Sequence, residues 1–338
     1  MTKKTMLAAT LTHYRQNDLK LTQTSIPTIG QHDVLVKVRA ASINPIDAKT
    51  MAGKMRFILS YKLPLIMGSD FAGEIVAVGS RVNKFKVGDA VYGRPRKSRI
   101  GTFADYFAIN ADEIALKPKN LSYTEAAAIP LVGLTSYQVL HDVMAIQPGQ
   151  KVLIQAGAGG IGTFAIQLAK QLGAFVTTTT SAAHQQLVRD LGADQVIDYH
   201  QINFADVLNH YDAVFDTLGG QNLVQAFDII KPGGHVVSIS GMPTAKFAKM
   251  AGLPYWKQLV LSLASRQLMR RARQTKSHYE FLLMKPSGVE LAKLTEMIEQ
   301  KRLQPIIDRV FPFEAISEAL AYSQQGHATG KIIVQMPN

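Results

Sequence analysis

The glycine-rich stretch at residues 157–162 is the part of the sequence whose residue types and spacing point most directly to chemistry. Gly157, Gly159 and Gly162 fit the pattern G-x-G-x-x-G, between the apolar run KVLIQA and the helical pattern TFAIQLAKQLG. Glycines at this spacing allow a tight turn and a close backbone approach to a pyrophosphate, and the following helix N-terminus offers N–H groups to phosphates. The stretch predicts dinucleotide binding, with Gly160 and Ile161 completing the loop.

The end of the next expected strand, VTTTTSAAHQQ, indicates which dinucleotide is bound. An NAD site usually places an acidic residue there to hold the ribose 2′-hydroxyl. This chain has no acid before Asp190 and instead offers the hydroxyls of Thr179, Thr180 and Ser181, followed by His184. Because an acid would repel a 2′-phosphate, its absence favours NADPH over NADH. His184 fits an ordinary surface histidine equally well.

Composition excludes several other kinds of site. The chain has 338 residues and no cysteine, so disulfides, cysteine-ligated zinc, iron–sulfur clusters and thiol nucleophiles are excluded. Apolar residues make up 47% of the chain, which is enough for a sizeable core. No apolar run is long enough for a transmembrane helix, and the N-terminus lacks the pattern of a signal peptide. A cytoplasmic location is the expectation.

The chain is strongly basic, with 37 basic and 25 acidic residues and a formal charge of +12. Much of the excess lies in residues 246–276, which contain eight basic residues and no acid, interleaved with WKQLVLSLASRQLMRRAR. The simplest interpretation is a helix with a solvated basic face. A patch for lipid or nucleic acid is the alternative, because excess charge of this kind suits anionic partners.

Two patterns of secondary structure follow one another along the chain. The first third is rich in short β-like runs, such as HDVLVKVRAASI and MGSDFAGEIVAVG, which predict a β-rich barrel or sandwich. From Gln150 onward, short apolar runs alternate with helical patterns, as expected for a doubly wound parallel sheet.

Many of these runs resemble the medium-chain dehydrogenase/reductase superfamily. They include GSDFAGEIVAVGSRVNKFKVGDAVYG, AAAIPLVGLTSYQVL, AGAGGIGTFAIQLAKQLGA, LGADQVIDY, FDTLGG, KPGGHVVSISG and GHATGKIIV. The resemblance implies an α/β protein with a GroES-like β-rich barrel domain and a doubly wound Rossmann domain. It places the GroES-like substrate domain at 1–125, the Rossmann NADP-binding domain at 126–285, and a return to the substrate domain at 286–338.

The zinc ligands of this superfamily's alcohol dehydrogenases are missing. A cysteine of those enzymes is matched here by Asn44, and their His-Glu pair is matched by Ser69-Asp70. Serine and asparagine do not form a tight tetrahedral zinc site, so no metal is expected. The chain resembles the zinc-independent quinone oxidoreductase branch, which includes NADPH-dependent alkenal/enone reductases. A structural role is the favoured interpretation of Asp70, and a role in the zinc-free pocket is the alternative.

Within that branch, the N-P-x-D-x-K run nominates Asn44, Asp47 and Lys49 to orient the substrate carbonyl. A structural interpretation competes with this one, because Asn44-Pro45 suits a turn and Asp47 suits a helix cap. The resemblance also places Asn44 and Thr135 at the nicotinamide and Tyr199 near the 2′-phosphate. The remaining predicted cofactor contacts lie at strand ends and in the C-terminal tail: Asp216, Thr217, Gly219, Ser240, Gly241, Gly330 and Lys331.

The expected function is hydride transfer from NADPH to a conjugated carbonyl, either an enone or enal C=C bond or a quinone. The alternatives are a non-catalytic NADPH-binding sensor and a nucleic-acid-binding protein, although no nucleic acid is expected. Residues 277–285, SHYEFLLMK, match the last Rossmann strand, which often pairs across a dyad in this superfamily, so a homodimer is expected. Peripheral membrane contact through residues 246–276 stays open.

Overall fold

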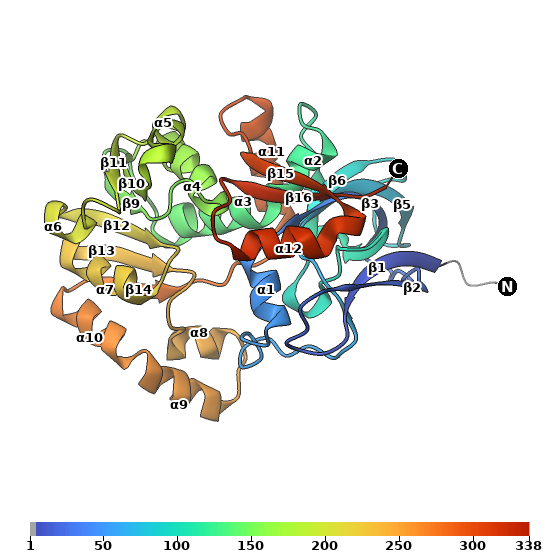
Figure 1. Ribbon diagram of the computed structural model, residues 1–338, viewed down its shortest axis with the longest axis horizontal. Helices are drawn as coiled ribbons and strands as arrows, with labels where there is room; N and C mark the ends of the chain where they lie inside the picture. Colours follow the sequence, from blue (N-terminus) through green and yellow to red (C-terminus); the bar gives the residue numbers. More distant parts are fainter. Residues whose placement is uncertain (1–4, 338) are drawn as a thin grey trace. The chain divides into compact units, whose positions relative to one another are not determined.

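The computed structural model describes residues 5–337, and its chain divides into two units (Figure 1). Unit 1 comprises Met1–Leu134 with Lys285–Asn338, and unit 2 comprises Thr135–Met284. The predicted boundaries at 125 and 285 differ from these by nine residues and one residue. The larger difference arises because helix α3 (Pro130–Tyr137) runs across the boundary, so the helical pattern alone gives no sign of it.

Unit 1 is built on antiparallel strands that occur early in the chain and are completed by its C-terminal tail. One sheet has the order β15-β16-β3-β5-β6-β8, with β7 also pairing with β3, and a second has the order β2-β1-β4. The strands are β1 (Thr5–Leu11), β2 (Lys20–Ser25), β3 (Asp33–Ile43), β4 (Leu65–Ile66), β5 (Phe71–Val78), β6 (Ala90–Gly93), β7 (Tyr106–Asn110), β8 (Ile114–Leu116), β15 (Ile307–Pro312) and β16 (Lys331–Gln335).

Helices cover the sheets of unit 1, and their ends follow local sequence signals. Helix α2 starts at a capping box in which Ser122 and Glu125 satisfy each other's backbone N–H groups. Fully buried Phe71, Phe103 and Phe313 lie in the core of this unit. The helices and 3₁₀ turns are α1 (Pro45–Met51), η1 (Lys97–Arg99), η2 (Ala111–Glu113), α2 (Tyr123–Ala127), α11 (Gly288–Glu299), η5 (Phe313–Ala315) and α12 (Ile316–Gln324).

Unit 2 is a doubly wound parallel sheet with the strand order β11-β10-β9-β12-β13-β14. Numbered from β9, this is the order 3-2-1-4-5-6 of dinucleotide-binding folds, and it confirms the predicted Rossmann architecture. The order reverses between β9 and β12, and ligands bind such sheets outside the strand ends at this point. The strands are β9 (Lys151–Ile154), β10 (Phe175–Thr180), β11 (Gln195–Asp198), β12 (Tyr211–Asp216), β13 (Ile230–Ser238) and β14 (His278–Phe281).

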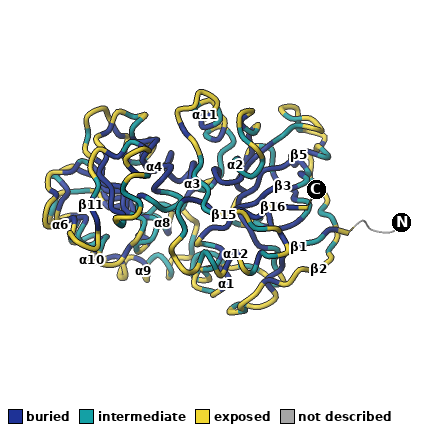
Figure 2. The backbone as a smooth tube through the Cα atoms, turned by 45° about the horizontal axis from the view of Figure 1, so that its top comes forward, coloured by how far each residue is buried: buried dark blue, intermediate teal, exposed yellow. Residues whose placement is uncertain are grey.

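Helices pack on this sheet, with α4 on β9 and β10 and α7 on β12 and β13. Figure 2 shows buried backbone, in dark blue, concentrated along the strands of each unit. In the described residues, no helix is both long and apolar enough to cross a bilayer. The helices of unit 2 are η3 (Gln138–Val143, a π-helix), α4 (Gly160–Gln171), η4 (Ala182–His184), α5 (Gln185–Asp190), α6 (Phe204–Val207), α7 (Gly220–Ile229), α8 (Ala245–Met250), α9 (Tyr255–Ala264) and α10 (Arg266–Gln274).

The basic segment 246–276 folds differently from the sequence interpretation. It forms α8, α9 and α10 rather than one helix with a basic face. Gly252, with φ at 66°, and Pro254, the N-cap residue of α9, separate the first two helices, and Ser265 separates α9 from α10. The single-helix prediction was wrong because glycine and proline stop a helix regardless of the charge pattern around them.

Candidate active site

Four polar side chains lie at the same end of four neighbouring strands in unit 1. Lys331 begins β16, Asn44 follows β3, Asp70 precedes β5 and Arg94 follows β6. These strands are adjacent and antiparallel in the order β16-β3-β5-β6, so their starts and ends alternate along one sheet edge. The exposed fractions are 5%, 1%, 0% and 2%, respectively. We call these four residues the polar row.

The centre of the polar row is held by a continuous set of hydrogen bonds. Asn44 Nδ2 donates to Asp70 Oδ2 at 2.9 Å, and Ser42 Oγ donates to the same oxygen at 2.8 Å. Lys331 Nζ donates to Asn44 Oδ1 at 2.5 Å and to the Ile43 carbonyl at 3.1 Å. The Lys331 ammonium also lies 3.6 Å from Asp70 Oδ2. Because its oxygen faces a cation and its nitrogen an acid, the Asn44 amide is fixed in one orientation.

Arg94 adds a second buried cation that the sequence interpretation did not nominate. Its Nη1 donates to the Pro95 carbonyl at 2.6 Å, and its Nε has no hydrogen-bond partner among the described residues. Burial lowers the pKa of Arg94, and the nearby charge of Asp70 opposes this shift. Burial likewise lowers the pKa of Lys331, again opposed by Asp70. With both bases protonated and Asp70 ionised, the row carries one excess positive charge.

Asp47 lies beneath the row on α1 and is 2% exposed. Its Oδ2 accepts a hydrogen bond of 2.8 Å from the backbone N–H of Asn44, the N-cap residue of this helix. Burial raises the pKa of Asp47 to about 7, and the charge of Asp70 contributes in the same direction. Asp47 thus has the structural role predicted for it, as part of the capping box of α1, and it also borders the polar row.

Asp47 should give the stability of the protein a distinct pH dependence. Its pKa is about 7 in the folded chain, whereas the pKa of an aspartate in the unfolded chain is about 4. Between these values the folded state binds more protons, so stability falls as pH rises, by up to about 1.4 kcal/mol per pH unit. We expect Asp47→Asn to remove this slope in urea denaturation curves recorded across that range. An unchanged slope in the variant would contradict this assignment.

The other two predicted residues of this unit have different surroundings. Lys49 is exposed on α1 and is not part of the hydrogen-bonded polar row. Gly330 has φ at 80°, and a Cβ there would lie 2.3 Å from the Ile306 carbonyl oxygen. The backbone alone therefore requires glycine at position 330, directly before Lys331 in the row.

The glycine-rich loop of unit 2 fits a dinucleotide. A Cβ on Gly157 would lie 2.2 Å from Thr178 Oγ1, and one on Gly162 would lie 2.3 Å from the Ala156 carbonyl oxygen. A Cβ on Gly159 would meet that same oxygen only at 3.4 Å and nothing closer. Two glycines therefore allow close packing, and Gly159 leaves room for a ligand to approach the backbone.

Helix α4 begins directly after this loop and presents its N-terminus to it. Gly159 is the N-cap residue, with no side-chain cap, and Gly160, Ile161 and Gly162 form the first turn. Uncapped N–H groups and the positive end of the helix dipole suit a pyrophosphate. The loop and the helix start that follow it have the features that binding a dinucleotide requires.

The predicted 2′-phosphate residues lie around the end of β10. Thr179 is buried, and its Oγ1 accepts a 3.1 Å hydrogen bond from Ala156 N–H, so this hydroxyl anchors the glycine loop. Thr180, the last residue of β10, is also buried. Ser181 is the N-cap residue of the 3₁₀ turn η4, without a side-chain capping hydrogen bond, and the turn ends at His184. Tyr199, which follows β11, is 58% exposed.

A second set of predicted cofactor residues forms a hydrogen-bonded network at the ends of β12 and β13. Asp216 is fully buried and accepts hydrogen bonds from Gly219 N–H at 2.8 Å and from Ser238 Oγ. Burial raises the pKa of Asp216. Ser240 Oγ donates to the Thr217 carbonyl at 2.8 Å, which ties the two strand ends together. Asp216 thus shapes the loops at the strand ends.

The last two predicted residues of unit 2 are Gly241 and Thr135. Gly241 N–H donates to Ser238 Oγ at 2.7 Å, which extends the same network. Thr135 is 3% exposed in helix α3.

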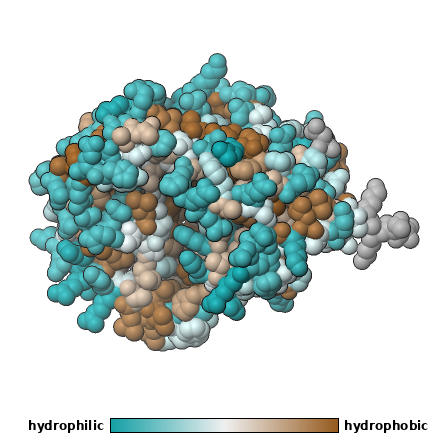
Figure 3. All heavy atoms as spheres, in the orientation of Figure 1, coloured by the Kyte–Doolittle hydropathy of each residue, from teal (hydrophilic) through white to brown (hydrophobic). Residues whose placement is uncertain are grey.

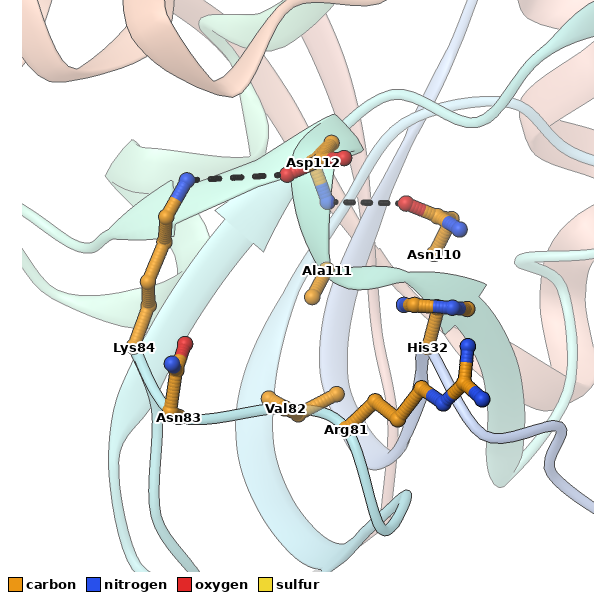
Figure 4. A pocket seen from close by; sticks show the side chains of 8 residues that line it. All are labelled: His32, Arg81, Val82, Asn83, Lys84, Asn110, Ala111 and Asp112. Carbon is orange, nitrogen blue, oxygen red and sulfur yellow. Dashed lines mark hydrogen bonds and ion pairs between the residues drawn. The ribbon is translucent and has the colours of Figure 1, made fainter.

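Unit 1 also has a small pocket apart from the polar row (Figure 4). It has a volume of about 60 Å³ and is lined by His32, Arg81, Val82, Asn83, Lys84, Asn110, Ala111 and Asp112. Asn110 pairs with Asp33, the first residue of β3, whereas Asn44 follows the last. The pocket and the polar row therefore lie at opposite ends of β3, and the pocket takes no part in the site.

The chain is similar to known oxidoreductases over most of its length. Residues 30–119 match the alcohol dehydrogenase GroES-like domain family, and residues 191–334 match the zinc-binding dehydrogenase family. A 2-methylene-furan-3-one reductase of Solanum lycopersicum is 35% identical over 97% of this chain and 79% of its own length. The chloroplastic NADPH-dependent alkenal/one oxidoreductase of Arabidopsis thaliana is 35% identical over 91% of this chain and 73% of its own.

A solved structure shares the whole architecture. The quinone oxidoreductase of Coxiella burnetii is 33% identical and superposes with a TM-score of 0.86, covering 99% of this chain and 100% of that chain. The domain matches confirm the GroES-like and Rossmann assignments made from the sequence. The chain belongs to the quinone oxidoreductase branch of the medium-chain dehydrogenase/reductase superfamily and is an NADPH-dependent oxidoreductase.

Proposed function

We propose that this protein reduces conjugated carbonyl compounds with NADPH and without zinc, acting on the C=C bond of enones and enals or on quinones. The observation that carries the proposal is the polar row, in which Lys331 and Asp70 fix the Asn44 amide and Arg94 adds a second cation. The reductase and quinone oxidoreductase names of the tomato, Arabidopsis and Coxiella relatives support the same substrate class.

Independence from zinc is supported by the side chains in the polar row and by Ser69 beside it. Asn44 and Ser69 are poor zinc ligands, and the Lys331 ammonium already contacts Asn44 Oδ1 and lies near Asp70. In residues 5–337, no three His, Asp or Glu side chains are grouped so that they could hold a metal ion. The Lys331 ammonium, held by these contacts, supplies positive charge to the row without a metal ion.

In this proposal the two units have separate tasks. Bound NADPH supplies the hydride, and the glycine loop with the start of α4 holds its pyrophosphate. The polar row, with its excess positive charge and oriented Asn44 amide, stabilises negative charge that develops on the substrate oxygen. Asp47, which keeps a proton up to about pH 7, is the group we assign to supply the proton that completes reduction.

The proposal is tested by measuring NADPH and NADH oxidation with a panel of enals, enones and quinones. We expect turnover of several panel members, a preference for NADPH, and no loss of rate after treatment with a zinc chelator. Silence across the whole panel would instead favour a non-catalytic NADPH-binding sensor. A preference for NADH would overturn the interpretation of Thr179, Thr180, Ser181 and His184.

Asn44→Ala should separate catalysis from cofactor binding. Removing one oriented hydrogen-bond donor from an oxyanion site typically lowers kcat by roughly 100-fold or more. We expect a loss of kcat that is much larger than the change in the Kd for NADPH, measured by steady-state kinetics and by fluorescence titration. Lys54→Ala, an exposed change close in sequence, is the matched control and should retain its kcat. Equal kcat in Asn44→Ala and the control would remove Asn44 from the mechanism.

We also infer a homodimer formed by pairing of β14 with its copy. β14 is the edge strand of the unit 2 sheet and is hydrogen-bonded to β13 on one side only, in the order found for the described residues. Unpaired strand edges favour pairing with another chain. Light scattering should give twice the chain mass of 37.0 kDa, and a monomer would contradict the inference.

We further propose a cytoplasmic location, which suits a chain without cysteine and is tested by cell fractionation.

A further inference from the structure

An unusually large share of the exposed apolar side chains lies on and around α9. Of 18 large hydrophobic residues that are exposed in the described chain, seven fall between residues 242 and 263. In Figure 3 a brown patch lies at the lower edge of the view, where Figure 1 shows α9. We call the following set the α9 apolar face: Met250 (68% exposed), Tyr255 (73%), Trp256 (57%), Leu259 (50%), Val260 (44%) and Leu263 (71%).

Unpaired cations lie beside this face, chiefly on α10. Arg266, Arg270 and Arg273 are exposed, and no ion pair of theirs is found in the described residues. The α10 arginines, as we call these three, contrast with Lys246 and Arg271, which pair with Glu280 at 2.9 Å and with Asp228 at 3.4 Å. No acidic residue occurs between 246 and 276 to neutralise them.

The apolar and basic groups meet in one cavity between α8, α9, α10 and β14. Its volume is about 620 Å³, and Leu263 of the α9 apolar face lines it together with Met269 and all three α10 arginines. The cavity therefore offers several cations next to apolar side chains. This combination suits an anionic headgroup that is attached to a hydrocarbon tail.

We propose that α8, α9 and α10 dock onto the surface of an anionic phospholipid bilayer. The α10 arginines contact headgroup phosphates, and the α9 apolar face enters the boundary between headgroups and acyl chains. Tryptophan and tyrosine favour this boundary, and basic side chains are attracted to anionic leaflets. The proposal is independent of the proposed enzymatic function.

The same observations disfavour two other occupants of this surface. A second copy of the chain would bring two sets of α10 arginines together, and their like charges would repel. Nucleic acid would account for the arginines but would leave most of the α9 apolar face in water, because phosphate contacts dominate such binding. A bilayer surface satisfies both the charges and the apolar side chains.

Trp256 makes the proposal directly testable, because it is the only tryptophan of the chain. Its fluorescence is recorded as vesicles of phosphatidylcholine, with or without phosphatidylserine, are added to the full-length protein. We expect a blue shift and co-sedimentation with the phosphatidylserine vesicles only, both weakened by high salt. Quenching by lipids brominated near the headgroup should confirm that Trp256 enters the interface.

Matched charge variants distinguish this surface from the general positive charge of the protein. The triple variant Arg266→Gln, Arg270→Gln, Arg273→Gln should bind phosphatidylserine vesicles at least about tenfold more weakly. The control variant Arg81→Gln, Lys86→Gln, Arg302→Gln removes the same charge from exposed positions of unit 1 and should bind like the original chain. Trp256→Ser with Leu263→Ser should reduce binding without any change of charge.

Three results would overturn the proposal. One is equal weakening of lipid binding in the two triple variants, and another is an unchanged Trp256 spectrum with no sedimentation. The third is a blue shift produced without lipid, by raising the protein concentration or by adding a DNA duplex, which would assign the surface to a second copy or to nucleic acid.

Discussion

Asp70→Asn is expected to lower the free energy of unfolding by about 3–5 kcal/mol, because it leaves buried cations without their counter-charge. The Asp70 carboxylate is fully buried, lies 3.6 Å from Lys331 Nζ, and accepts hydrogen bonds from Ser42 and Asn44. The asparagine has nearly the same shape, so the loss reports charge rather than volume. Urea denaturation near neutral pH, followed by circular dichroism, measures it.

A double-mutant cycle supplies the control for Asp70→Asn. Lys331→Met removes the partner cation and should also destabilise the protein. In the double variant Asp70→Asn with Lys331→Met, the total loss should be smaller than the sum of the single losses. Each single variant leaves one charge of the pair without its partner, whereas the double variant removes both charges. A loss below about 1 kcal/mol for Asp70→Asn would be that of an exposed ion pair and would contradict the buried network.

Gly159→Ala is expected to weaken NADPH binding by at least about tenfold while the protein stays folded. The backbone at Gly159 has φ at −75° and ψ at 169°, which alanine adopts easily, and the added methyl would meet only the Ala156 oxygen at 3.4 Å. The methyl instead fills the space through which a pyrophosphate approaches the backbone. Stability should change by less than about 1 kcal/mol, the usual scale for a helix N-cap residue.

Gly162→Ala provides the contrast for this experiment. Its methyl would lie 2.3 Å from the Ala156 carbonyl oxygen and 2.7 Å from Gly157 Cα, so it should lower stability and NADPH binding together. Calorimetric titration with NADPH and thermal denaturation of both variants separate the two effects. Wild-type affinity in Gly159→Ala would contradict the assignment of this loop to the pyrophosphate.

The nucleotide loop could be predicted from the sequence because it is local. Gly157, Gly159 and Gly162 lie within six residues, and the flanking strand and helix have clear periodicities. The polar row could not be predicted in the same way. Lys331 and Asn44 are 287 residues apart and meet only because β16 pairs antiparallel with β3. No sequence pattern within either segment specifies that pairing.

Arg94 could not be predicted from the sequence either, although it is closer in the chain to Asp70 than Lys331 is to Asn44. It directly follows β6, and the register that pairs Phe71 with Gly93 places it opposite Asp70. A basic residue at the end of a strand is usually solvated, so the sequence offered no reason to choose Arg94 over Arg96 or Arg99. Those two neighbours form ion pairs with Glu113 and Asp33. Only the pairing of β5 and β6 distinguishes Arg94 from them.

The number of charges in residues 246–276 was not enough to predict how this segment folds. Its composition predicted a basic face, but Gly252 and Pro254 end α8 before α9, and Ser265 separates α9 from α10. As a result α9 presents mainly apolar side chains and α10 presents arginines. Most of the segment's exposed apolar side chains therefore lie on α9, and four of the eight basic residues lie on α10. The sequence interpretation, which treated the segment as one helix, merged them.

The measurement that tests the central claim most directly is the position of deuterium in the product of an enone reduced with NADPH deuterated at the reactive C4 position. The account predicts a saturated ketone that carries the deuterium on the carbon β to the carbonyl, with the same yield after chelator treatment. An allylic alcohol with deuterium on the former carbonyl carbon, or a product lost on chelation, would contradict zinc-independent reduction of a conjugated carbonyl.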